Sequence, residues 1–319
     1  MIDNRKREMA ERASILYYEK NYMQNEVAKE LGVSRSLVSQ LLSYARNNGI
    51  VEISINIDEF NLRMIRREIE LRVNFPQVKQ FYIMSSDSED ETRRKLGDFA
   101  APYLFDMINE SRVIGVNLGA SVEKAINSLT RYTFPDSRDK DVVQIMGGFS
   151  NDIHRAHPIE LVKKLSSILN CGYFYLNCPA IVAQEELRSA LLNEESIRSV
   201  IQMWEKIDLA IMGIGTVTDD SKLDSLLSDD MKKMMKESNA RADVNINFFD
   251  CRGEYLPILE NHKISLGYDG LKRINKKVAI CHGLHKKEAI LSAMKAGIID
   301  VLITDSITID AVESELKTG

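Results

Sequence analysis

From residue 78 onward, short apolar runs alternate with stretches of helical periodicity. Seven runs have the length and content of buried strands: residues 78–84, 112–116, 141–146, 173–176, 208–214, 278–281 and 300–304. Helical patterns separate most of them, at 95–109, 122–131, 158–169, 184–204, 223–238 and 286–297. Strands that alternate with helices form βαβ units, so the pattern predicts a C-terminal α/β domain with a mainly parallel sheet covered on both faces.

Two segments depart from this alternation. Residues 244–256 (VNINFFDCRGEYL) predict a hairpin with a turn at Cys251-Arg252-Gly253. The polar run SSDSEDETRR at 85–94 predicts an exposed loop.

The N-terminal residues follow a purely helical pattern. Residues 4–20 predict a first helix, and 24–43 (QNEVAKELGVSRSLVSQLLS) satisfy the packing constraints of a helix-turn-helix. Gly32 lies in the turn, where a positive φ is needed, and Ser34 is a suitable N-cap for the second helix. The positions that the two helices must bury are apolar: Val27, Leu31, Val33, Val38 and Leu41.

The opposite face of the second helix is polar. It carries Ser34, Arg35, Ser36, Ser39 and Gln40, whose donors and acceptors suit base edges in the major groove of double-stranded DNA. The alternative is an ordinary helical hairpin whose small polar residues face solvent. The agreement of so many positions favours the DNA-reading interpretation.

A connector follows the helix-turn-helix. Asn47-Asn48-Gly49 is a helix stop, and Ile50–Ile57 alternates like a short strand that could form the wing of a winged helix. We therefore expect a DNA-binding domain at 1–57 and an effector-binding and oligomerisation domain at 58–319, with a connector helix within 58–77. A narrow apolar stripe on that helix indicates either a solvated connector or an oligomerisation surface: Leu62, Ile65, Ile69 and Val73.

Charge adds an argument for assembly. Residues 1–57 contain eight Lys/Arg and seven Asp/Glu, a net charge of +1, whereas the remainder of the 319-residue chain carries −6. A module with so little excess positive charge releases few counterions and binds DNA weakly as a single copy. We therefore expect a homo-oligomer.

Composition bears on location. No apolar run approaches the ~18 residues of a membrane span, and MIDNRKREMAER lacks the apolar stretch of a signal peptide. The cysteines form no CxxC pair and predict no disulfide framework: Cys171, Cys178, Cys251 and Cys281. A cytoplasmic protein without membrane partners is the expectation.

Glycine-rich turns follow several of the predicted strands, where ligands bind in open α/β sheets. Gly119-Ala120-Ser121 opens a helix and could bind an anion with backbone N–H groups and a hydroxyl, although packing alone would also require glycine there. Gly147-Gly148 and Gly213-Ile214-Gly215 are similar, and each could equally be a tight turn. Lys286 and Lys287 fall near the first turn of another helix, where a cation suits a bound phosphate or is a tolerated surface lysine.

Metal and catalytic chemistry have weaker support. His154-x-x-His157 and His282-x-x-His285 lack the third and fourth ligands of a zinc site, so solvated or substrate-facing histidines are favoured. There is no G-x-S-x-G elbow, P-loop or G-x-G-x-x-G fingerprint. Asp243, Asp250 and Asp305 could act as acids or bases, but nothing in the sequence pairs them. We expect no enzyme, no metal and no cofactor.

The order of these parts resembles the SorC family of sugar-responsive transcriptional regulators over essentially the whole chain. The stretches that carry the resemblance are VIGVNLGAS, VVQIMGGFS, DLAIMGIGTV, FFDCRGEYL and VAICHGLHKKEAILSAMKAGIIDVLITD. It implies an effector domain like the sugar-phosphate isomerase and glucosamine-phosphate deaminase fold without enzyme activity. It also implies a tetramer whose DNA affinity changes when a phosphorylated sugar or related metabolite binds.

The resemblance also implies effector-binding residues. The family's phosphate loop, usually Gly-Thr-Thr, falls at Gly119-Ala120-Ser121, and its Gly-Asp-Ile falls at 242–244, which keeps Asp243 for sugar hydroxyls. Its Gly-Gly-x-x-Lys becomes His282-Gly283-Leu284-His285-Lys286, and a further loop follows Gly147-Gly148, where a family glutamine is replaced near Arg155. Ala120 lacks a hydroxyl that could bind phosphate, so a different or more weakly held effector is plausible.

These observations predict a DNA-binding regulator controlled by a phosphorylated sugar or polyol. Two alternatives stay open at this point. One is a sugar-phosphate isomerase or deaminase with an added N-terminal domain, and the other is a regulator that has lost its effector.

Overall fold

The computed structural model describes residues 2–53, 59–135, 137–148, 157–218, 223 and 227–318. The chain divides into two compact units, residues 1–62 and 63–319.

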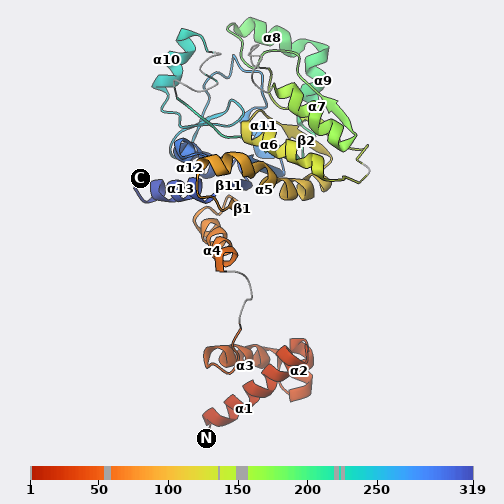
Figure 1. The fold of residues 1–319 in the computed structure, drawn as a ribbon, viewed down its shortest axis with the longest axis vertical. Coiled ribbons are helices and arrows are strands. Elements are labelled where there is room, and N and C mark those ends of the chain that lie inside the picture. The colour runs from red at the N-terminus through yellow and green to blue at the C-terminus, as the bar shows by residue number, and fades with distance from the viewer. Residues whose placement is uncertain are drawn as a thin grey trace. The chain divides into compact units, whose positions relative to one another are not determined.

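The first unit is a bundle of short helices (Figure 1). They are α1 (Ile2–Ser14), which continues as the π-helical turn η1 (Ile15–Glu19), α2 (Gln24–Leu31) and α3 (Arg35–Asn47). Gly32 ends α2 with a φ of 64°, and the Ser34 hydroxyl accepts a hydrogen bond of 3.2 Å from the backbone N–H of Leu37. The predicted turn glycine and N-cap are therefore confirmed. The core of the unit consists of Ala10, Ala13, Val27, Ala28, Val38, Leu41, Leu42 and Ala45.

The wing expected over residues 50–57 has no counterpart in its described part. Residues 50–53 form no strand, because backbone N–H groups of Ile50 and Val51 instead bond to the carbonyl of Ala45 at the end of α3. Residues 54–57 lie outside the described residues, so a winged form of the helix-turn-helix stays a prediction.

Helix α4 (Glu59–Asn74) lies within the range predicted for the connector helix. Leu71 is fully buried, and Arg67 pairs with Asp310 and, at 2.6 Å, with Glu313 of α13. Three residues of the predicted apolar stripe are exposed in the single chain: Ile65 (41%), Ile69 (57%) and Val73 (76%).

A seven-stranded sheet forms the centre of the second unit. Its order is β1-β11-β10-β5-β2-β3-β4, and every neighbouring pair is parallel. All seven predicted strands belong to it: β1 (Gln80–Met84), β2 (Val113–Val116), β3 (Asp141–Gln144), β4 (Gly172–Phe174), β5 (Leu209–Met212), β10 (Lys276–Ile280) and β11 (Val301–Asp305). The mainly parallel α/β prediction is confirmed.

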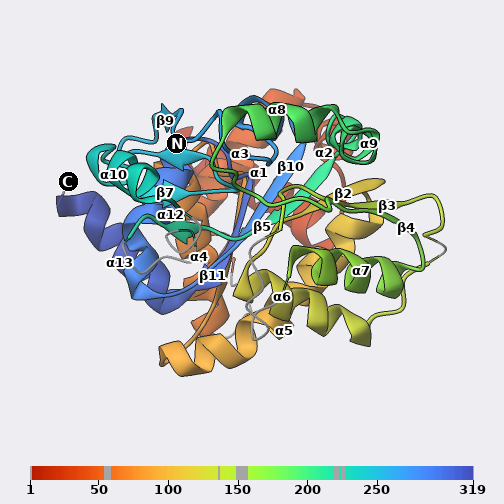
Figure 2. The same ribbon diagram turned by 90° about the horizontal axis from the view of Figure 1, so that it is seen from above.

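Helices cover both faces of this sheet (Figure 2). One face packs against α5 (Glu89–Asn109), α6 (Ala120–Ser128) with the 3₁₀ turn η2 (Leu129–Arg131), and α7 (Pro158–Leu169). The other packs against α4, α9 (Glu195–Trp204), α11 (Tyr268–Arg273), α12 (Lys287–Lys295) and α13 (Ser306–Thr318). The remaining helices are α8 (Glu185–Asn193), α10 (Asp229–Glu237) and the 3₁₀ turn η4 (Leu284–Lys286).

Several predicted boundaries were wrong. The polar run 85–94 is not a loop throughout, because Ser88 caps α5 at the N–H of Glu91 and the acidic residues that follow favour a helix N-terminus. The single helix expected at 184–204 breaks at Glu194, whose backbone is extended. Helix α10 begins only after its cap Ser228.

A second, four-stranded sheet lies beyond the first. It is antiparallel, in the order β6 (Gly215–Thr216), β7 (Ala242–Asp243), β8 (Phe248–Phe249), β9 (Tyr255–Leu256). The predicted hairpin is therefore confirmed. Its turn needs Gly253, because φ is 84° and a Cβ atom would lie 2.4 Å from the backbone nitrogen of Ala296.

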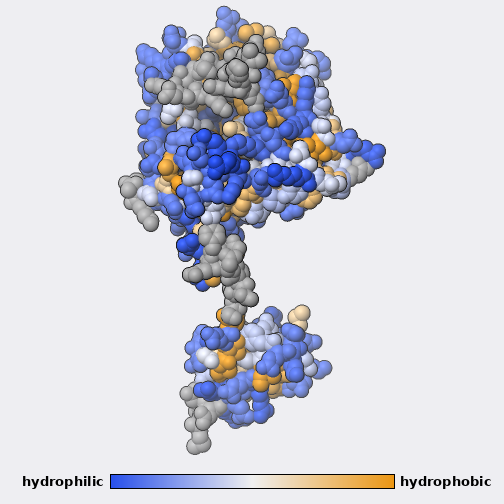
Figure 3. Space-filling view, in the orientation of Figure 1, coloured by the Kyte–Doolittle hydropathy of each residue, from blue (hydrophilic) through white to orange (hydrophobic). Residues whose placement is uncertain are grey.

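The surface in Figure 3 is mainly hydrophilic, with small apolar areas between polar ones. Among the described helices, none is both long and apolar enough to span a bilayer.

Candidate functional site

The recognition-type helix α3 separates buried from exposed residues as the sequence predicts. Val38, Leu41, Leu42 and Ala45 are buried, whereas the five predicted DNA contacts are exposed: Ser34, Arg35, Ser36, Ser39 and Gln40. The Ser34 hydroxyl already caps the helix. The long side chains of Arg35 and Gln40 therefore have the greatest reach from this face.

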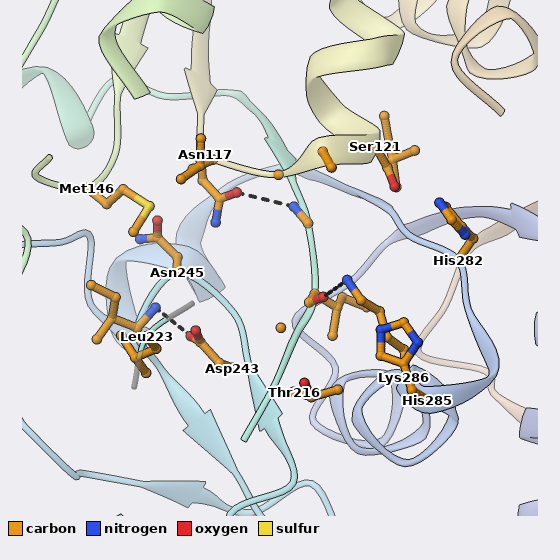
Figure 4. A pocket seen from close by; sticks show the side chains of 18 of the residues that line it. Asn117, Ser121, Met146, Thr216, Leu223, Asp243, Asn245, His282, His285 and Lys286 are labelled. Carbon is orange, nitrogen blue, oxygen red and sulfur yellow. Dashed lines mark hydrogen bonds between the residues drawn. The ribbon is translucent and has the colours of Figure 1, made fainter. Parts of the chain in front are cut away.

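A cavity of about 590 Å³ lies beyond the carboxyl ends of β2, β5 and β10 (Figure 4). These strands are neighbours in the sheet, and the second sheet contributes residues from β6 and β7. Such a position is where open α/β sheets bind ligands. The described lining includes Arg93, Asn117, Gly119, Ala120, Ser121, Lys124, Met146, Thr216, Leu223, Asp243, Asn245, Ile246, His282, His285 and Lys286.

The structure brings five of the seven predicted effector residues together in this cavity: Gly119, Ala120, Ser121, Asp243 and Lys286. Gly147 and Gly148 are not among its described lining residues. They face the segment 178–180 instead, with the N–H of Gly148 bonded to the Cys178 carbonyl at 2.8 Å. A Cβ atom on Gly147 would lie 2.5 Å from the backbone of Pro179, so its glycine serves close backbone packing. Residues 149–156, including His154 and Arg155, lie outside the described residues.

Residues 117–121 lead from β2 into α6 at the mouth of the cavity. The Asn117 side chain is buried and accepts a hydrogen bond of 3.2 Å from the N–H of Gly213, which joins the turn after β2 to the turn after β5. Gly119 then caps α6 with an extended backbone, and Ser121 lies in the first turn. Backbone N–H groups of a first turn carry partial positive charge and suit an anion.

Lys286 and Lys287 point in different directions. The Nζ atom of Lys286 donates a hydrogen bond of 2.7 Å to the Ile214 carbonyl at the cavity wall. Lys287 instead pairs at 2.8 Å with Glu315 of α13. Of the two sequence candidates, only Lys286 contributes to the described lining.

The loop before Lys286 is held by two side chains from other elements. The N–H of Gly283, whose φ is 114°, donates to the Thr308 hydroxyl at 2.8 Å, and the N–H of Leu284 donates to the Glu89 carboxylate at 2.9 Å. These donors at the start of η4 are already used. The first turn of α6 is therefore a better position for an anion than the start of η4.

Sequence reasoning missed two cations of the lining, Arg93 of α5 and Lys124 of α6. Lys124 Nζ donates to the Arg93 carbonyl, which ties the two helices together beside Ser121. Arg93 lay in the run interpreted as a loop, and Lys124 lies one helical turn after Ser121. This spacing is the sequence signal that could have identified Lys124 as a lining residue. With Lys286, they give three cations against one carboxylate, Asp243, among the described lining residues.

His282 occupies the family's glycine position and lines the same cavity. Burial is the main reason that its pKa is lowered; Lys286 and Lys124 lower it further, whereas Asp305 and Glu89 raise it. Its Nδ1 atom is buried without a hydrogen-bond partner among the described residues. Within the described part of the chain, no group of three His, Cys, Asp or Glu side chains could hold a metal.

Asp243 lies on the opposite side of the cavity from Ser121 and His282 (Figure 4). Burial raises the pKa of its carboxyl to about 6, against the effects of a hydrogen bond from Ile246 and of the charges of Lys263 and Lys286. The Asp243 carboxyl is therefore mostly ionised at pH 7, but much less acidic than an exposed aspartate. Asn117 and Asn245 add amide groups to the same side.

Comparison with known proteins identifies the family. The family model described as "Putative sugar-binding domain" matches residues 61–312. The chain belongs to the SorC family of sugar-binding transcriptional regulators. It is 24% identical over 319 residues to the deoxyribonucleoside regulator of Bacillus subtilis (strain 168), a match that covers 99% of this chain and 100% of the relative.

The similarity to known regulators covers both units of the chain. The chain is 24% identical to the sorbitol operon regulator of Klebsiella pneumoniae, covering 91% of this chain and 92% of that one. The crystal structure of full-length SorC from Klebsiella pneumoniae has a TM-score of 0.73 and 24% identity, covering 95% of this chain and 98% of that one. The protein is therefore a sugar-responsive, DNA-binding transcriptional regulator, as the sequence predicted.

Proposed function

We propose that the effector of this SorC-family regulator is a phosphorylated sugar or polyol bound in the 590 Å³ cavity. The uneven distribution of charged side chains around the cavity supports this proposal. Ser121, His282 and Lys286 lie on one side in Figure 4, with the cations Arg93 and Lys124 also in the lining. A phosphate suits that side, because charge-assisted hydrogen bonds and a helix N-terminus both favour an anion.

The other side suits a polyhydroxylated carbon chain. The Asp243 carboxylate accepts hydrogen bonds from hydroxyls, while Asn117 and Asn245 offer amide groups and Met146 and Leu223 offer apolar contacts. Gly119, Ala120 and Ser121 are proposed phosphate contacts. Gly147 and Gly148 would support the site only indirectly, through the loop that follows them.

The test is a thermal-shift screen of the full-length protein against phosphorylated sugars, their unphosphorylated forms and inorganic phosphate. An effector at 100 times its Kd stabilises the folded state by about 2.7 kcal/mol. We expect a shift with a phosphorylated compound and a smaller one with its parent sugar. Equal shifts with both forms would show that the cationic side does not bind phosphate.

We further propose that residues 1–57 read DNA through Ser34, Arg35, Ser36, Ser39 and Gln40. Residues 58–319 would bind the effector and assemble several copies, with a connector helix within 58–77. The exposed apolar residues Ile65, Ile69 and Val73 of α4 support assembly, because a row of large apolar side chains is more stable when a partner covers it. The family resemblance points to a tetramer, and the composition of the chain points to the cytoplasm.

An enzyme with an isomerase or deaminase reaction is the second candidate, supported by the proposed likeness of the α/β unit to that fold and by Asp243 with a pKa of about 6. Turnover of sugar phosphates by the purified protein would support it. A regulator that has lost its effector is favoured only by Ala120 and His282, and a screen without any shift would support that alternative.

A further inference from the structure

The segment 243–247 forms part of the cavity wall in an unusual backbone conformation. Asn245 and Ile246 both have a φ of 58°, in the left-handed region. Asparagine adopts this region at small cost, but a β-branched isoleucine does so only when its surroundings impose it. Asp243, Asn245 and Ile246 all line the cavity. The contacts that hold this segment in place therefore determine the positions of three side chains in the cavity wall.

Asparagine side chains hold one part of the segment. Asn245 Nδ2 donates to the carbonyls of Ile145 (3.1 Å) and Leu266 (3.0 Å), and Asn247 Nδ2 donates to those of Val244 (3.1 Å) and Leu266 (3.0 Å). Three of these four bonds attach the turn to residues outside it, Ile145 and Leu266. They leave the Ile246 carbonyl and the Asn247 Oδ1 atom for another partner.

Lys263 supplies that partner from outside the lining. Its side chain is 2% exposed, and Nζ donates to the Ile246 carbonyl (3.1 Å) and to Asn247 Oδ1 (2.7 Å). Nζ also pairs with Glu260 at 2.5 Å and lies 3.4 Å from the Tyr255 hydroxyl, which itself donates to Glu260. A buried cation is costly unless it is paired and hydrogen-bonded, and this one has four partners.

We propose that Lys263 is a positioning residue of the effector pocket, which fixes the 243–247 turn and keeps Asp243 ready to accept hydrogen bonds from ligand hydroxyls. This inference rests on the proposed function of the cavity. The link to Asp243 has two parts. Asp243 Oδ1 accepts the N–H of Ile246 at 2.7 Å, and the Ile246 carbonyl accepts from Lys263.

The second part is electrostatic. The charge of Lys263 lowers the pKa of Asp243, and Asp243 in turn raises the pKa of Lys263, which burial lowers. The other charges acting on the pair are Lys286 on Asp243 and Glu260 and Arg188 on Lys263. Arg241, directly before β7, and Glu288, in the first turn of α12, pair with each other at 3.3 Å. Without Lys263, Asp243 loses one of the two cations, Lys263 and Lys286, that favour its ionised form.

The first test measures Asp243 without any ligand. Full-length protein carrying ¹³Cγ-labelled aspartate is titrated by NMR, with Asp243→Asn used to assign the resonance. We expect the midpoint of Asp243 to rise by about one pH unit in Lys263→Met, which corresponds to a tenfold change in the ionisation equilibrium. In the control Tyr255→Phe, which retains the cation, the midpoint should stay unchanged. An unchanged midpoint in Lys263→Met would overturn the proposal.

The same coupling is measurable if Lys263→Met does not fold. Since the interaction is reciprocal, Asp243→Asn should lower the pKa of Lys263, observed through its ¹³Cε resonance, and no change would contradict the proposal. Binding is compared with glucose 6-phosphate and inorganic phosphate as probes. Lys263→Met should weaken the sugar phosphate about tenfold at pH 7.5 while leaving phosphate within twofold. Equal weakening of both probes would exclude a role specific to Asp243.

The outcomes separate the two proposals. If the wild-type protein binds neither probe, the identity assigned to the effector is at fault, but the NMR midpoints still decide the role of Lys263. If both probes bind and the midpoints do not move, the cavity keeps its proposed function and the positioning role fails.

Discussion

The Nζ atom of Lys286 lies 2.7 Å from the carbonyl oxygen of Ile214 and donates a hydrogen bond to it. The bond joins the turn after β10 to the turn after β5, across the cavity wall. The bond fixes the ammonium group at the cavity wall through a carbonyl, which is an uncharged partner. A bound anion would find this cation already in place.

Lys286→Ala should abolish the thermal stabilisation by a phosphorylated effector, because it removes a cation that is held at the cavity. Lys287→Ala is a matched control, one residue further along and paired outward with Glu315 at 2.8 Å. Thermal shifts of both variants with an effector from the screen provide the comparison. An equal loss in the two variants would indicate a general effect of charge instead of a contact.

Asp243→Asn should stabilise the effector-free protein at neutral pH. The folded-state pKa of about 6 lies above the ordinary 3.8, so the folded state retains a proton that the unfolded state releases between these values. This group therefore contributes less stability as pH rises from about 4 to 6. Removing it should stabilise the fold at pH 7.5 by about 1–3 kcal/mol.

Urea unfolding at several pH values checks the direction. The difference between Asp243→Asn and the parent protein should widen from pH 4.5 upward and level off above about pH 6. A difference that narrows with rising pH would mean that Asp243 is stabilised as the carboxylate.

The fold was largely predictable because buried parallel strands leave a local signal. Each of the seven apolar runs was short and bounded by polar or glycine-rich turns, so its strand could be located without the rest of the chain. Helix α13 was not predicted, because it begins at Ser306 directly after β11; its signal was Asp305, whose carboxylate accepts the N–H groups of Ile307 and Thr308 at the helix start. The start of α5 was missed although Ser88 and Glu91 have the spacing of a capping box.

The pocket was predictable only where a residue type and a turn coincided. Ser121 and Lys286 lie just beyond the turns that follow β2 and β10, so the topology of a parallel sheet brings them to one edge. Arg93 reaches the cavity from a helix whose start was misplaced. The role of Lys263 depends on its tertiary contacts with residues 246 and 247, which no local pattern encodes.

Replacing Arg35 or Gln40 with alanine should cost about 1–3 kcal/mol at a specific operator and relax base preference at one position. Both side chains are exposed on the face of α3 opposite its buried residues. An operator selected from random duplexes and a scrambled duplex serve as matched targets in a binding titration. Equal losses on both would reveal contacts to phosphate only.

Residues 1–57 alone should bind the selected operator at least ~100-fold more weakly than the full chain, because a single copy lacks avidity. Residues 1–57 have a net charge of only +1. The unit has its own core, so the fragment is a fair comparison. The companion measurement is the molecular mass of full-length Ile69→Glu, determined by sedimentation. A mass equal to that of the parent protein, together with equal operator affinities of the fragment and the full chain, would remove the argument for assembly.

The cavity is lined mostly by turns and helix ends that extend beyond the strands, and the hydrogen bonds of the parallel sheet do not involve those side chains. The residues that line the cavity can therefore change without changing the hydrogen bonds that build the sheet. If the cavity binds the effector as proposed, exchanges such as alanine at 120 or histidine at 282 would alter which metabolite is detected while the scaffold persists. Related proteins with this fold could then come to bind a different effector through a few substitutions at the cavity, without any intermediate sequence that fails to fold.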